Sequence, residues 1–212
     1  MHQFLKKILI LISALFVSNC SIYKYNHGVE QIKNSTESTF PSIIKSNYTL
    51  KYQATIDVFK NHLSGLLFIK QTDSITKHIL FITQLGMKMF DFEIKTNDLN
   101  VVYLFESLNN KLFLESLKRN LSNIFLVGIE KLEPIKYLQN QTKTIFYRID
   151  VDNNKKFYTL DSSFFLTKQE TFHKQKLESK INYSYNRTTN SYSHIKCKQY
   201  GLIKIYFEFD EL

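Results

Sequence analysis

The sequence has 212 residues and a formal net charge of +9, with five glycines, two prolines, two cysteines and no tryptophan. This length suits one domain with a substantial core and is too short for two domains of ordinary size. The basic residues are spread along the chain and form no block, which argues against nucleic-acid binding. They either favour anionic lipid and acidic partners or simply provide solubility.

Residues 1–19 are expected to be a signal peptide and not part of the fold. Lys6 and Lys7 precede an apolar run at residues 8–17, which is shorter than the roughly 20 residues of a membrane-spanning helix. The sequence Val17-Ser18-Asn19-Cys20 then resembles the lipobox cut by the bacterial lipoprotein signal peptidase. This resemblance implies that Cys20 becomes an acylated N-terminus, attached to the membrane at about 0.8 kcal/mol per buried CH₂. The alternative is an ordinary secreted protein.

The residue after Cys20 indicates which membrane would hold the protein. In Gram-negative lipoproteins, Asp at this position retains the protein at the inner membrane, whereas this sequence has Ser21. The following residues 22–27 also lack the acidic run of surface-exported lipoproteins. The resemblance therefore implies a lipid-anchored protein on the periplasmic face of the outer membrane.

The remainder of the chain is divided into a tether and one domain. Residues 20–46 are polar and are expected to form a tether followed by a short helix at 41–46, with Pro41 in its first turn. Residues 47–212 are expected to form a single domain rich in strands. The β-rich runs, separated by clusters of turn-forming residues, are 48–58, 62–71, 77–84, 88–95, 100–105, 143–150, 155–161, 179–186, 191–198 and 202–209.

One segment, residues 109–126, has the periodicity of a helix instead of a strand. Its apolar residues fall on one stripe with mostly polar residues opposite, and they are Leu112, Phe113, Leu117, Leu121, Ile124 and Phe125. The sequence thus predicts a mainly β fold with one or two helices. About ten antiparallel strands would twist into a curved, open β-barrel, with the helix covering its concave side. The 18 Phe and 13 Tyr either fill the interior or leave a cavity.

Residues that could carry chemistry are sparse. The histidines have no metal-ligand spacing, the few glycines form no phosphate-binding loop, and there is no G-x-S-x-G motif. The carboxylate pairs Asp91/Glu93 and Glu208/Asp210 alternate with large apolar residues, which is typical of a solvated strand face. Cys197 is expected to be a small buried apolar residue without a disulfide partner. We therefore expect a non-enzymatic protein without metal or cofactor.

The order of elements over residues 48–126 resembles the LolB-like family of outer-membrane lipoprotein receptors. Leu63-Ser64-Gly65 opens the second strand, Gln84-Leu85-Gly86 ends the third, and an alternating strand and an amphipathic helix follow. In that family a Pro-Leu-Gly turn projects its Leu to deliver lipoproteins into the membrane. The resemblance implies this role for Leu85, with Gly86 and Met87 in the same loop, although Gln84 replaces the Pro. Alternatively, Leu85 is a core residue at the end of a strand.

The same resemblance implies a hydrophobic cavity for acyl chains. By strand alternation Phe90, Phe92 and Ile94 would line its floor, and from the helix Leu112, Phe113 and Leu117 would cover them, unless these residues are ordinary core. The first hypothesis is an acceptor that takes acylated lipoproteins from a periplasmic carrier and helps insert them into outer-membrane lipid. The others are an interaction module of an outer-membrane complex and a carrier of another amphiphile.

Overall fold

The computed structural model describes residues 25, 28–32, 43–44, 49–58, 61–72, 76–95, 98–129, 132, 134–140, 142, 144–200 and 204–212. The predicted signal peptide and the lipid anchor Cys20 lie outside these residues. Within the part of the chain that the structure describes, no helix has both the length and the apolar character needed to cross a membrane.

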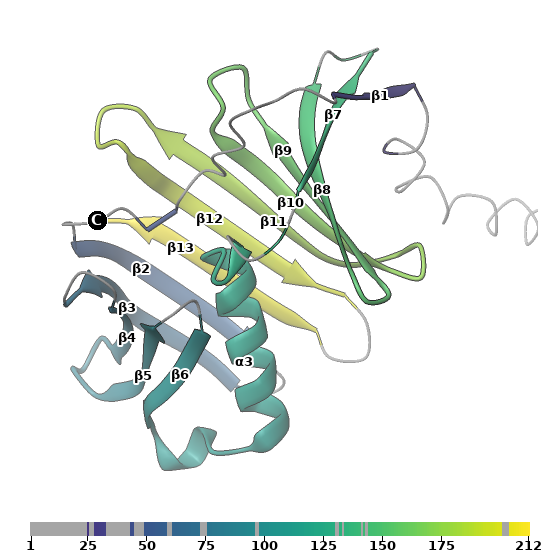
Figure 1. The fold of residues 1–212 in the computed structure, drawn as a ribbon. Coiled ribbons are helices and arrows are strands. Elements are labelled where there is room, and N and C mark those ends of the chain that lie inside the picture. Colours follow the sequence, from purple (N-terminus) through teal and green to yellow (C-terminus); the bar gives the residue numbers. More distant parts are fainter. Residues whose placement is uncertain are drawn as a thin grey trace, which may run out of the picture.

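The described residues form one antiparallel sheet of thirteen strands, ordered β1-β7-β8-β9-β10-β11-β12-β13-β2-β3-β4-β5-β6 (Figure 1). The two edge strands, β1 and β6, do not pair with each other, so the barrel is open. The strands before the helix are β1 (Val29–Gln31), β2 (Thr49–Val58), β3 (Asn61–Gln71), β4 (Lys77–Thr83), β5 (Lys88–Lys95) and β6 (Asp98–Leu104). Those after it are β7 (Ile135–Gln139), β8 (Thr144–Val151), β9 (Asn154–Leu160), β10 (Leu166–His173), β11 (Lys176–Asn186), β12 (Ser191–Gln199) and β13 (Ile205–Glu211).

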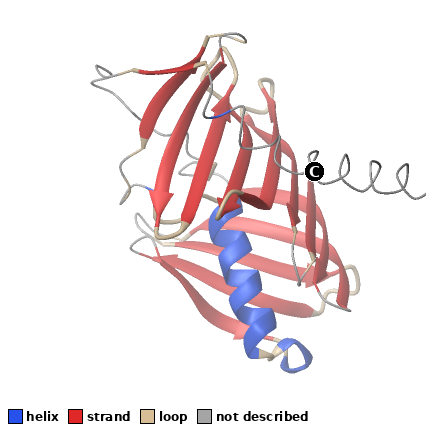
Figure 2. Ribbon diagram, turned by 90° about the vertical axis from the view of Figure 1, so that its right-hand side faces the viewer, coloured by secondary structure: helices blue, strands red, loops and turns tan. Residues whose placement is uncertain are grey.

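The helix α3 (Lys111–Ile124) follows a short 3₁₀ turn, η2 (Glu106–Leu108), and lies against the inner face of the curved sheet (Figure 2). Asn110 caps its N-terminus, since the side-chain oxygen accepts hydrogen bonds from the backbone N–H of Leu112 and Phe113 at 3.0 and 3.3 Å. Four apolar side chains on its inward face are almost completely buried: Phe113, Leu117, Leu121 and Ile124.

The predicted fold class, a mainly β, curved, antiparallel open sheet covered by a helix, is confirmed. The expected count of about ten strands was too low, because β1, β7 and β10 were missed. β7 is short and half-buried throughout, so it shows no alternation. In β10 three consecutive polar residues, Gln169, Glu170 and Thr171, are buried, which conceals the apolar pattern of a strand.

The prediction of a tether over residues 20–46 is wrong for its middle part. Residues Val29–Gln31 form β1 and pair antiparallel with β7, and Tyr25 is buried. The folded domain therefore begins before residue 47. Ile43 and Ile44 form a bend and belong to the main core, so the expected short helix is absent at these two positions. Pro41, its predicted first turn, lies outside the described residues.

Gly65 in β3 owes its place to the close approach of the neighbouring strand. A Cβ at this position would lie 2.0 Å from the Ile82 carbonyl oxygen and 2.8 Å from the Thr83 Cα, both backbone atoms of β4. No rotamer change can relieve such a clash, so a side chain here would push the strands apart.

We therefore predict that Gly65→Ala lowers the free energy of unfolding by about 1–3 kcal/mol, as overpacking against backbone does. Urea unfolding followed by circular dichroism measures this change. The matched control is Ser64→Ala, one residue earlier in the same strand, for which we expect a change within about 0.5 kcal/mol. Equal urea midpoints for the two variants would contradict the steric argument.

Candidate functional site

A tight turn between β4 and β5 presents Leu85 to solvent. The Thr83 carbonyl accepts a hydrogen bond from Gly86 N–H at 2.9 Å, and Thr83 N–H donates to the Met87 carbonyl at 2.9 Å. The Thr83 hydroxyl also accepts from Met87 N–H at 3.1 Å. Gly86 has φ +82°, the left-handed conformation that closes such a hairpin loop. These contacts define the turn with Gln84 in place of a Pro.

The exposure of Leu85 decides between the two interpretations of this residue. Its side chain is 95% exposed, and Met87 in the same loop is also exposed. Leu85 is therefore not a core residue at a strand end. The structure places an apolar side chain at the tip of a hydrogen-bonded turn. This side chain can leave water only by contact with something outside the domain, such as a membrane or a partner protein. Its role in membrane insertion stays a prediction.

Amphipathic side chains lie beside this turn. Lys88 Nζ is 5.0 Å from the centre of the Tyr103 ring and 2.9 Å from Asp91 Oδ2, and Asp91 also contacts His78 at 2.9 Å. On the edge strand β6, Val102 and Tyr103 are exposed. Tyr and Lys combine an apolar body with a polar end, which suits the headgroup region of a bilayer.

The predicted cavity residues form a closed core. Phe90 and Phe92 have no exposed surface, and their ring centres lie 5.1 Å apart. Phe113 and Leu117 on α3 are also buried, and Ile94 nearly so. A side chain without exposed surface cannot be touched by a water-sized sphere, either from outside or from an internal cavity. The structure thus brings these residues together, tightly buried, in one core cluster.

Leu112 does not cover that floor, and its assignment to the cavity is wrong. Its side chain is 58% exposed. Leu112 is the second residue of α3, two positions after the capping residue Asn110. At this end of the helix its side chain faces solvent and not the sheet. Helical periodicity predicts Leu112 on the same face as Phe113, but the sheet and its neighbours cover Phe113 and leave Leu112 exposed.

Polar contacts join the inward face of α3 to β12. Asn120 is buried and donates to the Ser116 carbonyl at 2.7 Å and to Gln199 Oε1 at 2.8 Å. The Cys197 thiol lies beneath the helix, with its Sγ 3.8 Å from Asn120 Oδ1. Farther along the helix, the Tyr183 hydroxyl donates to the Ile124 carbonyl at 3.0 Å. The helix is therefore held by apolar and polar contacts together.

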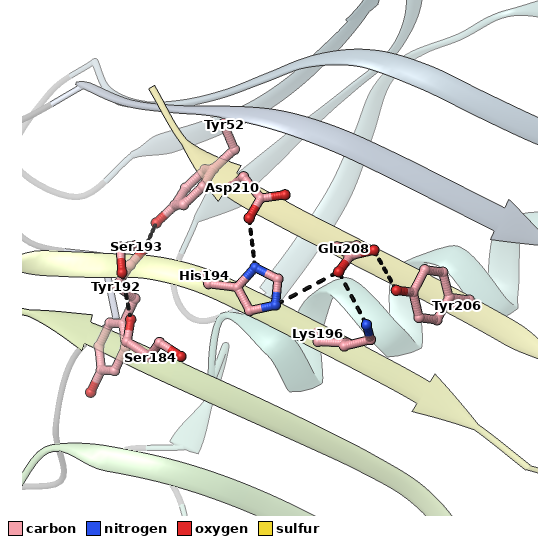
Figure 3. Close-up of polar contacts among 9 residues, drawn as sticks. All are labelled: Tyr52, Ser184, Tyr192, Ser193, His194, Lys196, Tyr206, Glu208 and Asp210. Carbon is pink, nitrogen blue, oxygen red and sulfur yellow. Dashed lines mark hydrogen bonds and ion pairs between the residues drawn. The ribbon is translucent and has the colours of Figure 1, made fainter.

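The carboxylate pair Glu208/Asp210 belongs to a charged ladder on the outer face (Figure 3). His194 lies 2.6 Å from Asp210 and 3.7 Å from Glu208, while Lys196 lies 3.1 Å from Glu208. The Tyr206 hydroxyl donates to Glu208 and, with Lys196, holds the pKa of this carboxyl below its usual range. These residues occupy opposed positions on β12 and β13. Such cross-strand pairs stabilise strand pairing by about 0.2–1 kcal/mol each.

Among the described residues, no group of three or more His, Cys, Asp and Glu side chains could hold a metal ion. Burial raises the pKa of the Cys197 thiol to about 12, so the reactive thiolate is disfavoured at neutral pH. Nothing in this arrangement activates the thiol as a nucleophile.

Sequence reasoning missed an aromatic cluster on the outer face of β8–β10. The Tyr25 ring stacks on Phe157 with centres 4.0 Å apart, and its edge contacts involve Phe146 and Phe172 at 5.0 and 6.2 Å. The Tyr25 hydroxyl donates to buried Glu170. The adjacent aromatic pairs 146–147 and 157–158 could have revealed the cluster, because neighbouring strand residues point to opposite faces. Aromatic residues on both faces indicate cover on both faces.

Comparisons with known proteins leave the family open. No protein-family model matches the sequence, and no curated protein matches it either. Among solved structures, a LolA superfamily protein from Nitrosomonas europaea is similar, with a TM-score of 0.49 and 11% identity over 80% of this chain and 86% of that chain. At this level of similarity, the function has to be argued from the residues of the chain itself.

We predict that Cys197 resists thiol reagents in the folded protein at pH 8 and reacts fully in guanidinium chloride. The spectrophotometric reagent DTNB measures both rates, in the chain without its signal peptide and with Cys20→Ser. Because burial raises its pKa, the folded thiol keeps its proton up to about pH 12, whereas the unfolded thiol, with the ordinary pKa of 9.0, loses it near pH 9. This contribution to stability is complete below pH 9 and is lost as the pH rises towards 12. Rapid labelling of the folded chain at pH 8 would contradict the burial.

Proposed function

We propose that this protein is a non-enzymatic, lipid-anchored acceptor of the outer membrane. It takes acylated proteins from a periplasmic carrier and helps their acyl chains enter the bilayer. The observation that carries the proposal is Leu85, held at the tip of a hydrogen-bonded turn with its side chain 95% exposed. The sequence resemblance to lipoprotein receptors, at the same loop, supports it.

The energetics of a single exposed Leu fit a transient membrane contact. Burial of one such side chain contributes about 2 kcal/mol. This free energy favours contact of the loop with lipid without fixing the loop there. A protein that releases cargo repeatedly requires such a reversible contact. Tyr103 and Lys88 beside the turn would lie at headgroup depth and limit how far Leu85 enters.

Uptake of an acyl chain requires α3 to move. Among the described residues, those of the predicted floor and of the buried helix stripe are at most 8% exposed, so they leave no room for an acyl chain between them as they stand. An acyl chain would take the place of Phe113 and Leu117 against the apolar residues of the floor, so apolar contacts would replace apolar contacts. No nucleotide is needed, because transfer depends only on the relative affinities of carrier, acceptor and bilayer.

The N-terminal segment sets the distance between anchor and fold. Tyr25 docks on the outer face of β8–β10, five positions after the predicted lipid anchor Cys20. An extended chain spans at most about 3.5 Å per residue, so the anchor lies within about 18 Å of Tyr25. With acylation of Cys20, the β8–β10 part of the sheet would sit close to the membrane surface.

A second candidate is an interaction module of an outer-membrane complex. The closed packing between α3 and the floor favours it, because a core without an opening offers no site for a lipid. A carrier of another amphiphile would need the same helix movement as the acceptor. The experiments below separate binding of acyl chains from the interaction module.

We predict that Leu85→Glu reduces delivery of an acylated protein to liposomes by tenfold or more, with cargo binding unchanged. Loss of about 2 kcal/mol of burial, together with a charge at the tip, accounts for this size. The measurement follows transfer of a fluorescent acylated protein from the acceptor to vesicles. The control is Phe164→Glu, since Phe164 is an exposed apolar residue in the β9–β10 turn. If both variants deliver cargo like the parent chain, the insertion role of Leu85 fails.

A single substitution can lock the helix. Asn120→Cys would place a thiol opposite native Cys197, whose Sγ already lies 3.8 Å from the Asn120 side chain. We predict that oxidation of this variant abolishes binding of a fluorescent acylated peptide and that dithiothreitol restores it. The reduced form of the same variant is the control. Undiminished binding in the oxidised form would exclude uptake beneath α3, and no binding in either form or in the parent would favour the interaction module.

A further inference from the structure

One end of the concave face is polar, in contrast to the rest. A continuous cross-strand row runs over four strands, because Lys156 pairs with Thr171, Thr171 with Ser179 and Ser179 with Gln199. The row ends in apolar neighbours on both sides, Ile149 and Ile205. It lies close to the strand ends, where β9 begins and β12 ends.

The helix covers this row and encloses a pocket. Arg119, Asn120 and Asn123 project from α3 over the row, and the cavity between helix and sheet has a volume of about 110 Å³. Asn154 and Glu178 complete the lining. Since one water occupies about 30 Å³ of liquid, this space holds a few waters or one small polar group. Arg119 is exposed, so the pocket has a mouth to solvent.

Among the described residues, the pocket contains a hydroxyl without a hydrogen-bond partner and more positive than negative side chains. Thr171 is only 3% exposed, yet within the described part of the chain its Oγ1 has no hydrogen-bond partner. Lys156 donates to Asn123 Oδ1 at 2.9 Å, and burial lowers the pKa of its ammonium group. The two cations Arg119 and Lys156 outnumber the single carboxylate of Glu178. A buried unpaired hydroxyl and a partly buried cation both cost free energy unless a ligand satisfies them.

We propose that this pocket binds one phosphate group. A phosphate offers several acceptor oxygens to the Thr171 and Ser179 hydroxyls. Its negative charge would pair with the positive charges of Lys156 and Arg119. Its size matches the cavity, whereas a larger polar headgroup would have to extend through the mouth. The proposal stands apart from delivery of acylated proteins and goes beyond it.

The surroundings suit either a free phosphate or the phosphate of a lipid. On the other side of Asn123 and Lys156 is a small recess of about 30 Å³, whose further lining includes Leu126, Ile129 and Tyr158. A phosphate ester could therefore place its polar end in the pocket and its apolar part towards this recess. The chemistry recognised is the same in both cases, and the test separates the two sources.

The test uses isothermal titration calorimetry on the chain without its signal peptide and with Cys20→Ser. The ligands are inorganic phosphate, dihexanoylphosphatidylglycerol below its micelle concentration, and uncharged dihexanoylglycerol, all at constant ionic strength. We expect one phosphate per chain, and binding weakened at least tenfold by Lys156→Gln and several-fold by Thr171→Val. Lys155→Gln, the exposed neighbour outside the pocket, is the matched control and should bind like the parent.

Each outcome decides the proposal. Equal binding of phosphate and the phospholipid identifies a free phosphate, and tighter binding of the phospholipid identifies a lipid phosphate; both support the pocket. Absence of binding by both ligands overturns it, as does binding that Lys156→Gln and Thr171→Val leave unchanged. If Lys156→Gln does not fold by circular dichroism, Arg119→Gln at the exposed mouth replaces it, with an expected several-fold loss.

Discussion

The packing of α3 against the concave face is the constraint on which the structure depends. Thirteen twisted strands form a sheet with two open edges, and its inner apolar surface must be covered. One helix of 14 residues provides that cover by burying Phe113, Leu117, Leu121 and Ile124. The two halves of the sheet meet where β13 pairs with β2, with Phe207 opposite Ile56. The helix connects the two halves in sequence and lies on the inner face of the sheet that they form (Figure 2).

The outer face has a second, smaller cover. Tyr25 fills an aromatic cluster on β8–β10, while the adjacent residues Tyr147 and Tyr158 belong to the main core on the inner face. Over these strands the sheet is therefore buried on both sides. Tyr25, five positions after the predicted lipid anchor Cys20, is thus itself part of the fold.

The sequence predicts best which large apolar residues of a strand enter the core. Phe90, Phe92 and Ile94 of β5, expected on one inward face, are all buried in the main core cluster. The same reasoning missed β10, where Gln169, Glu170 and Thr171 are buried although they are polar, which no hydropathy pattern reveals. It also misplaced Leu112, since periodicity gives the face of a helix but not the point at which neighbouring elements stop covering it. The exposure of Leu85 depends on hydrogen bonds within a turn, so the sequence left it open.

A closed interior is compatible with a lipid acceptor if the exchange of contacts is nearly balanced. Exposing four large apolar side chains of α3 costs roughly 6–12 kcal/mol, at about 1.5–3 kcal/mol each. Burying an acyl chain of about 16 carbons contributes roughly 12 kcal/mol, at about 0.8 kcal/mol per CH₂. The small difference would give binding weak enough for release into a bilayer, which offers the same burial without displacing a helix. The hydrogen bonds of Asn120 with Gln199 and of Asn123 with Lys156, beside Leu121 and Ile124, would break when the helix moves and form again when it returns.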